Sequence, residues 1–168
     1  AFYKSVNSVS QGFIRTEADE VQYNLHVLLR FDLERALVSG DLQVKDLQTA
    51  WNDRFYSDFG YHVASASQGC LQDVHWSVGL FGYFPTYSLG NVYAGCLYET
   101  LREACPQLDE DLRVGNLASA TDWLRDTVQC HGGLKMPRQT ISDACGFEPS
   151  EAPLLAYLKQ KFSDIYDL

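Results

Sequence analysis

The chain has 168 residues and a formal net charge of −9. Because an acidic surface repels phosphate backbones, and Lys and Arg form no cluster in this sequence, binding to nucleic acid is disfavoured. Hydrophobic residues make up 46% and charged residues 21%, which is typical of a globular chain and predicts one domain over residues 1–168. No apolar run approaches the ~20 residues that a membrane span needs, so we expect no membrane partner.

The cysteines and histidines argue against a self-contained metal site. The five cysteines are scattered and include no Cys-x-x-Cys pair, which indicates free thiols in a reducing compartment. No two of the four histidines have the spacing of an HExxH helix. The segment AFYKSVNSVS lacks the apolar centre of a signal peptide and does not begin with Met. We therefore expect a cytoplasmic protein whose chain is a processed product or a fragment.

The first predicted helix begins with Thr16 as its N-cap and ends at Gly40. Apolar residues recur along it at steps of three and four, which predicts a stripe that faces the core. The members of this stripe are Val21, Leu25, Leu28, Leu29, Leu33, Ala36 and Leu37. A second helix is predicted from residue 46 to Gly60. Before both helices, QGFIRT (11–16) is the one candidate for a strand.

Residues 69–85 are rich in glycine and have no regular period, so an irregular segment is predicted there. A helix follows Pro85 and ends before Pro106, and its two internal glycines, Gly90 and Gly95, predict close packing against another helix. Three further helices are predicted over 118–131, 136–145 and 150–168. The sequence therefore predicts a mainly α, all-helical domain.

Two motifs carry most of the information about function. The first is IRTEAD, in which Ile14, Arg15, Ala18 and Asp19 fit the pattern I/V-R-x-x-A-D; the second is GCLQDVHW (69–76), which fits G-x-x-Q-D-x-H-W. Both patterns are signatures of the carboxypeptidase Taq family of HExxH zinc metallocarboxypeptidases. The chain resembles the C-terminal portion of that family over essentially its whole length, including the segments FGYFPTYSLGN and YLKQKFSDIYDL.

The resemblance also shows what this sequence lacks. The family's HExxH helix and its following His-Glu-Ser-Gln motif supply the zinc ligands and the general base, and neither is present. The resemblance implies an all-helical fold that forms the C-terminal half of a groove. It further implies zinc, or cobalt in its place, in the complete enzyme, with no metal held by this chain alone. The implied partners are peptides with a free C-terminus, the missing N-terminal half, and a second copy in a homodimer.

The resemblance assigns catalytic roles to His75 and two tyrosines. In the wider HExxH superfamily, a His and a Tyr at similar spacing donate hydrogen bonds to the tetrahedral intermediate. By analogy, His75 is the predicted oxyanion donor, Tyr87 is its predicted partner, and Tyr83 competes for that role. Structurally, both tyrosines could instead be core aromatics.

Arg15, Gln72 and Asp73 are predicted to bind substrate. A guanidinium forms two parallel hydrogen bonds with a carboxylate, so Arg15 is the candidate for reading the C-terminus of the peptide. Gln72 and Asp73 would orient the loop or reach the peptide backbone. The structural alternative is that Arg15 simply pairs with Asp19 at a helix start.

The predicted function is that of a metallocarboxypeptidase, which removes C-terminal residues from peptides. This chain would supply the substrate and oxyanion side of the cleft and would be inactive alone. One alternative is a non-catalytic peptide-binding or interaction module derived from a truncated carboxypeptidase. A helical domain that does nothing without its other half is a further alternative.

Overall fold

The computed structural model describes residues 2–168, and within that range it contains helices and no strand. The chain divides into two compact units, Ala1–Leu89 and Gly90–Leu168, which we describe separately. The all-helical prediction is confirmed, whereas the prediction of a single domain stays a prediction. No helix among the described residues is both long and apolar enough to cross a membrane.

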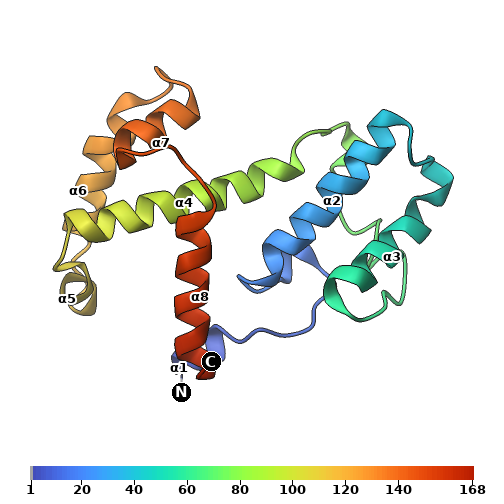
Figure 1. Ribbon diagram of the computed structural model, residues 1–168, viewed down its shortest axis with the longest axis horizontal. Coiled ribbons are helices and arrows are strands. Elements are labelled where there is room, and N and C mark those ends of the chain that lie inside the picture. The colour runs from blue at the N-terminus through green and yellow to red at the C-terminus, as the bar shows by residue number, and fades with distance from the viewer. Residues whose placement is uncertain (1) are drawn as a thin grey trace. The chain divides into compact units, whose positions relative to one another are not determined.

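In the first unit, two long helices precede an irregular segment, which leads into a third (Figure 1). Its helices are α1 (Phe2–Val6), α2 (Gln22–Ser39), α3 (Leu47–Phe59) and the start of α4 (Phe84–Ala104), with 3₁₀ turns η1 (Arg15–Glu17), η2 (Val44–Asp46) and η3 (Trp76–Val78). The second unit holds the rest of α4 and several shorter helices. These are α5 (Leu108–Arg113), α6 (Ala118–Thr127), η4 (Gln129–His131), α7 (Pro137–Cys145) and α8 (Ala152–Tyr166).

The first long helix begins later than the sequence predicted. Thr16 lies inside η1, and α2 starts at Gln22 because Asp19 performs the capping: its Oδ1 accepts the backbone N–H groups of Val21 and Gln22 at 3.0 and 2.9 Å. The strand candidate 11–16 forms no strand. The N-cap prediction for Thr16 was therefore wrong. The residues before α2 form the 3₁₀ turn η1, which includes Arg15.

The predicted ends of α2 and α3 are confirmed. Gly40 and Gly60 follow these helices in the left-handed conformation, with φ of 85° and 79°. Glycine adopts this conformation without the steric cost of a Cβ, so each helix ends where the sequence indicates.

The core of the first unit lies between α2 and α3. Leu29 and Leu33 from α2 pack with Trp51 and Phe55 from α3, and all four are buried. The predicted stripe was only partly right, because Leu25 and Leu28 are 36% and 45% exposed. The buried face of α2 instead contains a row of polar side chains at four-residue steps, namely His26, Arg30 and Glu34.

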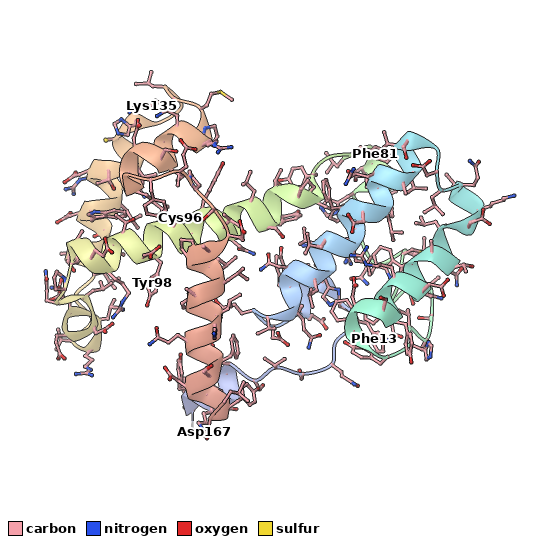
Figure 2. All side chains as sticks on the ribbon, in the orientation of Figure 1. Phe13, Phe81, Cys96, Tyr98, Lys135 and Asp167 are labelled. Carbon is pink, nitrogen blue, oxygen red and sulfur yellow. The ribbon has the colours of Figure 1, made fainter. Side chains whose placement is uncertain are left out.

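In the second unit, the prediction of close packing is confirmed at one of the two helical glycines. A Cβ on Gly95 would lie 2.8 Å from the backbone of Leu154, whereas one on Gly90 would meet nothing within 4 Å. Further along α4, Tyr98 packs edge-on against Tyr157, with 5.4 Å between the ring centroids (Figure 2). The close approach of α8 to α4 therefore depends on the missing side chain at residue 95.

Candidate functional site

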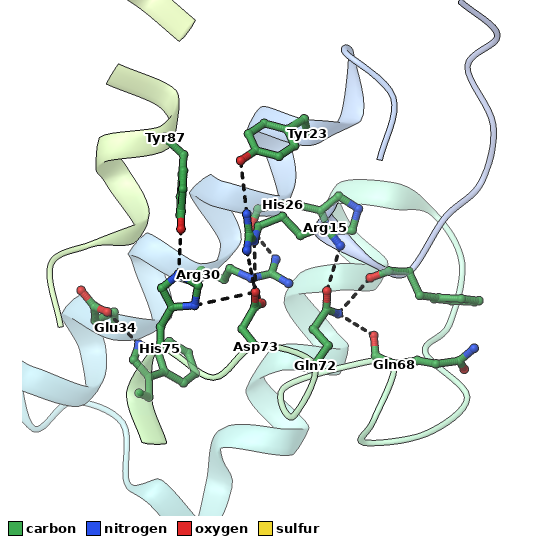
Figure 3. A network of polar contacts seen from close by, with 12 residues as sticks. Arg15, Tyr23, His26, Arg30, Glu34, Gln68, Gln72, Asp73, His75 and Tyr87 are labelled. Carbon is green, nitrogen blue, oxygen red and sulfur yellow. Dashed lines mark hydrogen bonds and ion pairs between the residues drawn. The ribbon is translucent and has the colours of Figure 1, made fainter. Parts of the chain in front are cut away.

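A single carboxylate organises the candidate site. Asp73 accepts hydrogen bonds at Oδ1 from Nε and Nη2 of Arg15, at 3.1 and 2.9 Å, and at Oδ2 from Nε of Arg30, at 2.6 Å (Figure 3). Arg15 comes from η1 and Arg30 from the middle of α2. The irregular segment that follows α3 is thereby tied to two elements that lie 58 and 43 residues earlier in the chain.

Arg15 uses its guanidinium within the site. Besides its bonds to Asp73, its Nη1 donates to the hydroxyl of Tyr23 at 3.2 Å, and its Cζ lies 4.8 Å from the centroid of the Tyr87 ring. Only 6% of Arg15 is exposed. Its ion-pair partner is Asp73, while Asp19 bonds to backbone groups, so the alternative of a pair between Arg15 and Asp19 is not formed.

The two buried guanidinium groups of this site share one ion-pair partner. Two guanidinium groups face one carboxylate, and Nη2 of the fully buried Arg30 has no hydrogen-bond partner. Burial lowers the pKa of Arg30 to about 10, which leaves it protonated at neutral pH. Burial alone would raise the pKa of Asp73, but Arg30 and Arg15 outweigh it and hold this pKa below its ordinary value. The buried side chain of Glu34, one turn further along α2, supplies a second carboxylate, so the two guanidinium groups leave no surplus of positive charge.

Gln72 holds the base of the same segment. Its Oε1 accepts the backbone N–H of Arg15 at 2.9 Å, and its Nε2 donates to the carbonyl oxygens of Phe13 and Gln68 at 2.9 and 2.8 Å (Figure 3). These bonds correspond to the first of its two predicted roles, orientation of the loop. Contact of Gln72 with a peptide backbone stays a prediction.

His75 and Tyr87 lie within hydrogen-bond distance. Nε2 of His75 is 2.9 Å from the Tyr87 hydroxyl, and the imidazole packs on Phe84 with 4.3 Å between ring centroids. His75 is 7% exposed, and burial lowers its pKa although Asp73 opposes this shift. Tyr83, the competing tyrosine, has its ring centroid 5.7 Å from that of His75 and is 45% exposed. At neutral pH, the His75 ring is therefore neutral and carries one N–H.

Sequence reasoning missed Arg30, Glu34 and Tyr23. Arg30 and Glu34 belong to α2, for which the sequence predicted an apolar buried face, and both lie on that face. Their signal was the four-residue spacing of His26, Arg30 and Glu34, since positions i, i+4 and i+8 share one side of a helix. The structure does bring together Arg15, Asp73, His75 and the two tyrosines, as Figure 3 shows for all but Tyr83.

The described residues do not form a metal site. Between residues 2 and 168, no group of three or more His, Cys, Asp or Glu side chains is arranged to hold a metal ion. His75 and Asp73 approach each other, with Nδ1 3.9 Å from Oδ1, but this gives two ligands at most. A tetrahedral site needs three or four such ligands.

A family model describes this sequence almost completely. The model for carboxypeptidase Taq (M32) metallopeptidase matches residues 1–162. The chain belongs to the carboxypeptidase Taq (M32) metallopeptidase family. It is 40% identical to thermostable carboxypeptidase 1 of Thermus thermophilus and 39% identical to carboxypeptidase 1 of Bacillus subtilis, each over 165 residues. The predicted family is thus confirmed.

The match to solved structures of the family is equally extensive. The crystal structure of M32 carboxypeptidase from Deinococcus radiodurans R1 superposes with a TM-score of 0.96 and 39% identity, over 99% of this chain and 34% of that one. The Thermus and Bacillus alignments cover 98% of this chain and 32% and 33% of those proteins. The chain therefore spans about a third of the length of these relatives, less than the half that the sequence suggested.

Proposed function

We propose that this chain forms the substrate side of the catalytic cleft of a metallocarboxypeptidase, an enzyme that removes residues from the C-termini of peptides. The observation that carries the proposal is the contact between His75 and Tyr87, at 2.9 Å, beside the guanidinium group of Arg15, whose Cζ lies 4.8 Å from the Tyr87 ring. Hydrogen-bond donors placed in advance stabilise the negative charge that develops when a peptide carbonyl is attacked. The family relationship supplies the reaction class.

In this proposal, His75 and Tyr87 stabilise the tetrahedral intermediate. A neutral imidazole and a phenol together have two protons, of which one lies between the two groups. When His75 donates from Nε2 to the Tyr87 oxygen, the hydroxyl proton of Tyr87 is free to donate to the developing oxyanion. Tyr83, more exposed and next to the pair, is the second candidate for that donor.

Arg15, Asp73 and Gln72 are proposed to prepare the binding side of the cleft. Arg15 remains the candidate for recognising the free carboxylate of the peptide, because it shares its ion-pair partner Asp73 with Arg30. In the structure, Arg15 already donates to Asp73 and Tyr23. To recognise a carboxylate, Arg15 must therefore either replace one of these hydrogen bonds by one to the peptide or attract the carboxylate electrostatically without direct contact.

The metal and the general base are proposed to come from family segments that this sequence does not contain, because the described residues offer no metal site. Zinc is the expected metal and cobalt an alternative. The isolated chain is accordingly proposed to be inactive. A homodimer follows only from the family resemblance, and a cytoplasmic location from the resemblance and the scattered cysteines; both stay predictions.

Reconstitution tests this function. Peptide hydrolysis is measured for the chain alone and after it is joined to the upstream family segment with zinc. We expect activity only in the joined protein. We expect His75→Ala to lower its kcat by about 10²–10³-fold, as loss of an oxyanion donor does, because Tyr87 loses the N–H that leaves its own proton free for the oxyanion. A much smaller effect on peptide binding is expected.

Tyr87→Phe removes the hydroxyl and keeps the ring, so it is also expected to lower kcat. Tyr56→Phe is the matched control, because Tyr56 lies at the end of α3 and stacks on His62, away from the cluster. Normal kcat in both the His75 and the Tyr87 variants would refute the oxyanion assignment. Peptide binding by the isolated chain that is lost on C-terminal amidation would favour the binding-module alternative.

A further inference from the structure

Glu34 is a buried carboxylate that the proposed chemistry does not use. It lies on the inner face of α2, where 5% of it is exposed. Its Oε2 accepts the indole Nε1–H of Trp76 at 2.7 Å, and its Oε1 accepts the backbone N–H of Gly82 at 2.5 Å. Both donors are neutral groups. A buried carboxylate with two well-placed donors is an unusual use of a charged residue in a core and calls for a structural reason.

The two donors lie at opposite ends of one segment. Trp76 directly follows His75, and Gly82 precedes the start of α4, which carries Tyr87. The segment 76–82 thus connects the two members of the proposed catalytic pair. Glu34 binds this connection at both ends, across 42 and 48 residues of sequence.

Between these two ends, the backbone of the segment is hydrogen-bonded mainly to itself. Residues 77–82 are all exposed, and Phe81, at 55%, lines a shallow pocket with Leu37 and Val44. Gly79 and Gly82 have φ of 78° and 77°, and the segment's other hydrogen bonds are local, such as Gly79 N–H to the carbonyl of Trp76 and Leu80 N–H to that of His75. Within the described part of the chain, its long-range hydrogen bonds are those to Glu34. A loop with few buried contacts opens easily unless it is tied to a rigid element.

We propose that Glu34 is a positioning residue, which fixes the distance between His75 and Tyr87 by tying both ends of segment 76–82 to α2. The catalytic part of this inference rests on the proposed function, whereas the structural part concerns the chain alone. The imidazole of His75 packs on Phe84, which is 1% exposed and follows shortly after the tied segment. Release of Gly82 would therefore loosen both the surface on which His75 rests and the helix turn that presents Tyr87.

The first test uses the 168-residue chain and nuclear magnetic resonance. In the unchanged protein, the indole proton of Trp76 is expected to be shifted downfield and to exchange slowly, as a donor to a buried carboxylate should. Trp51 is the internal reference, because its indole Nε1 is buried without a hydrogen-bond partner. A ring-to-ring Overhauser effect between His75 and Tyr87 reports their contact. Free exchange of the Trp76 indole proton would overturn the proposal without any variant.

The variants then separate the two ends of the tie. Glu34→Gln leaves one oxygen acceptor and places an amide NH₂ opposite the other donor, so at least one bond is lost. We expect the intensity of the Overhauser effect between the rings of His75 and Tyr87 to fall by more than half. Trp76→Phe removes the indole N–H, keeps an aromatic ring at this position and leaves the bond to Gly82 in place. It is expected to give a smaller loss, which keeps the test informative if the Gln variant folds poorly. Glu110→Gln, on an exposed residue of the second unit, is the control and should change nothing.

The second test addresses catalysis in the joined enzyme. A misplacement of about 1 Å can cost on the order of 10²-fold in rate, so Glu34→Gln is expected to lower kcat by ~10–10²-fold with KM changed far less. An intact contact between His75 and Tyr87 in both folded variants would refute the positioning role. Loss of the contact between His75 and Tyr87 with an unchanged kcat would confirm that Glu34 positions the two residues. It would refute their proposed catalytic roles.

Discussion

Asp73 shows how one side chain can hold several parts of a site. It accepts hydrogen bonds from Arg15 in η1 and Arg30 in α2, and its own backbone belongs to the segment that presents His75. A carboxylate shared by two buried guanidinium groups is stabilised by charge, which the lowered pKa of Asp73 reflects. Removal of this charge leaves two cations in a poorly solvated place.

Asp73→Asn is therefore expected to destabilise the protein by about 3–5 kcal/mol, the usual cost of breaking a buried ion pair from one side. The measurement is the midpoint of urea unfolding. Asp109→Asn is the matched control, because Asp109 forms a similar short pair with Arg102 on the surface, with 58% of its side chain exposed. The control should leave the midpoint nearly unchanged, and equal effects of the two variants would contradict a structural role for Asp73.

His26 predicts a dependence of stability on pH. Burial, together with the nearby charge of Arg30, lowers its pKa from the ordinary 6.5 to about 4. Between pH 4 and pH 6.5, His26 is protonated in the unfolded chain and neutral in the folded chain. The folded state therefore loses stability relative to the unfolded state as the pH falls from 6.5 toward 4. A shift of this size corresponds to roughly 3 kcal/mol.

Urea unfolding at pH 7 and pH 4.5 measures this loss. His26→Phe keeps an aromatic ring beside Phe55 and Phe59 and removes the titration. The variant should lose less stability between the two pH values than the unchanged protein does. An identical loss in both proteins would mean that other groups, among them His75, account for the dependence.

At the scale of elements, α4 contains two glycines that the sequence treats alike and the structure does not. Gly95 lies against the backbone of Leu154 in α8, whereas a Cβ on Gly90 meets open space. A glycine inside a helix costs about 0.5–1 kcal/mol relative to alanine when nothing else requires it. The two positions therefore form a matched pair in one helix.

Gly95→Ala is expected to destabilise the protein by about 1–3 kcal/mol, because a backbone neighbour cannot move aside as a flexible side chain can. Gly90→Ala is expected to stabilise it by about 0.5–1 kcal/mol. Thermal unfolding followed by circular dichroism measures both. A neutral or stabilising alanine at residue 95 would show that α8 does not approach α4 at this point.

At the scale of the whole molecule, the question is whether this chain holds a metal. No described group of ligands fits one, and the chain spans about a third of its carboxypeptidase relatives. We expect the purified chain to contain well below one zinc per molecule after mild chelation and re-addition of zinc, as measured by elemental mass spectrometry. One tightly held zinc per chain would refute the proposal that the ligands come from other segments.

The sequence by itself determined the family, the helical class and the ends of several helices. These properties depend on local signals: two contiguous motifs, apolar residues at helical spacing, and glycines such as Gly40 and Gly60 that end a helix through their own conformation. Local signals gave the wrong N-cap for α2, because Thr16 and Asp19 are both suitable capping residues and lie close together in the sequence. Asp19 rather than Thr16 satisfies the first amides of α2, because its side chain can reach them from the turn.

Only the tertiary structure decided which side chains share the candidate site. Arg30 and Glu34 look like the polar side of a surface helix in the sequence, yet both are buried, while Leu25 and Leu28 of the same helix are partly exposed. The physical reason is that their partners, Asp73 and the segment 76–82, lie about forty residues or more along the chain. Periodicity describes one helix at a time, whereas burial of a charge depends on a partner that pairs with it or donates hydrogen bonds to it. That partner is brought near only by folding.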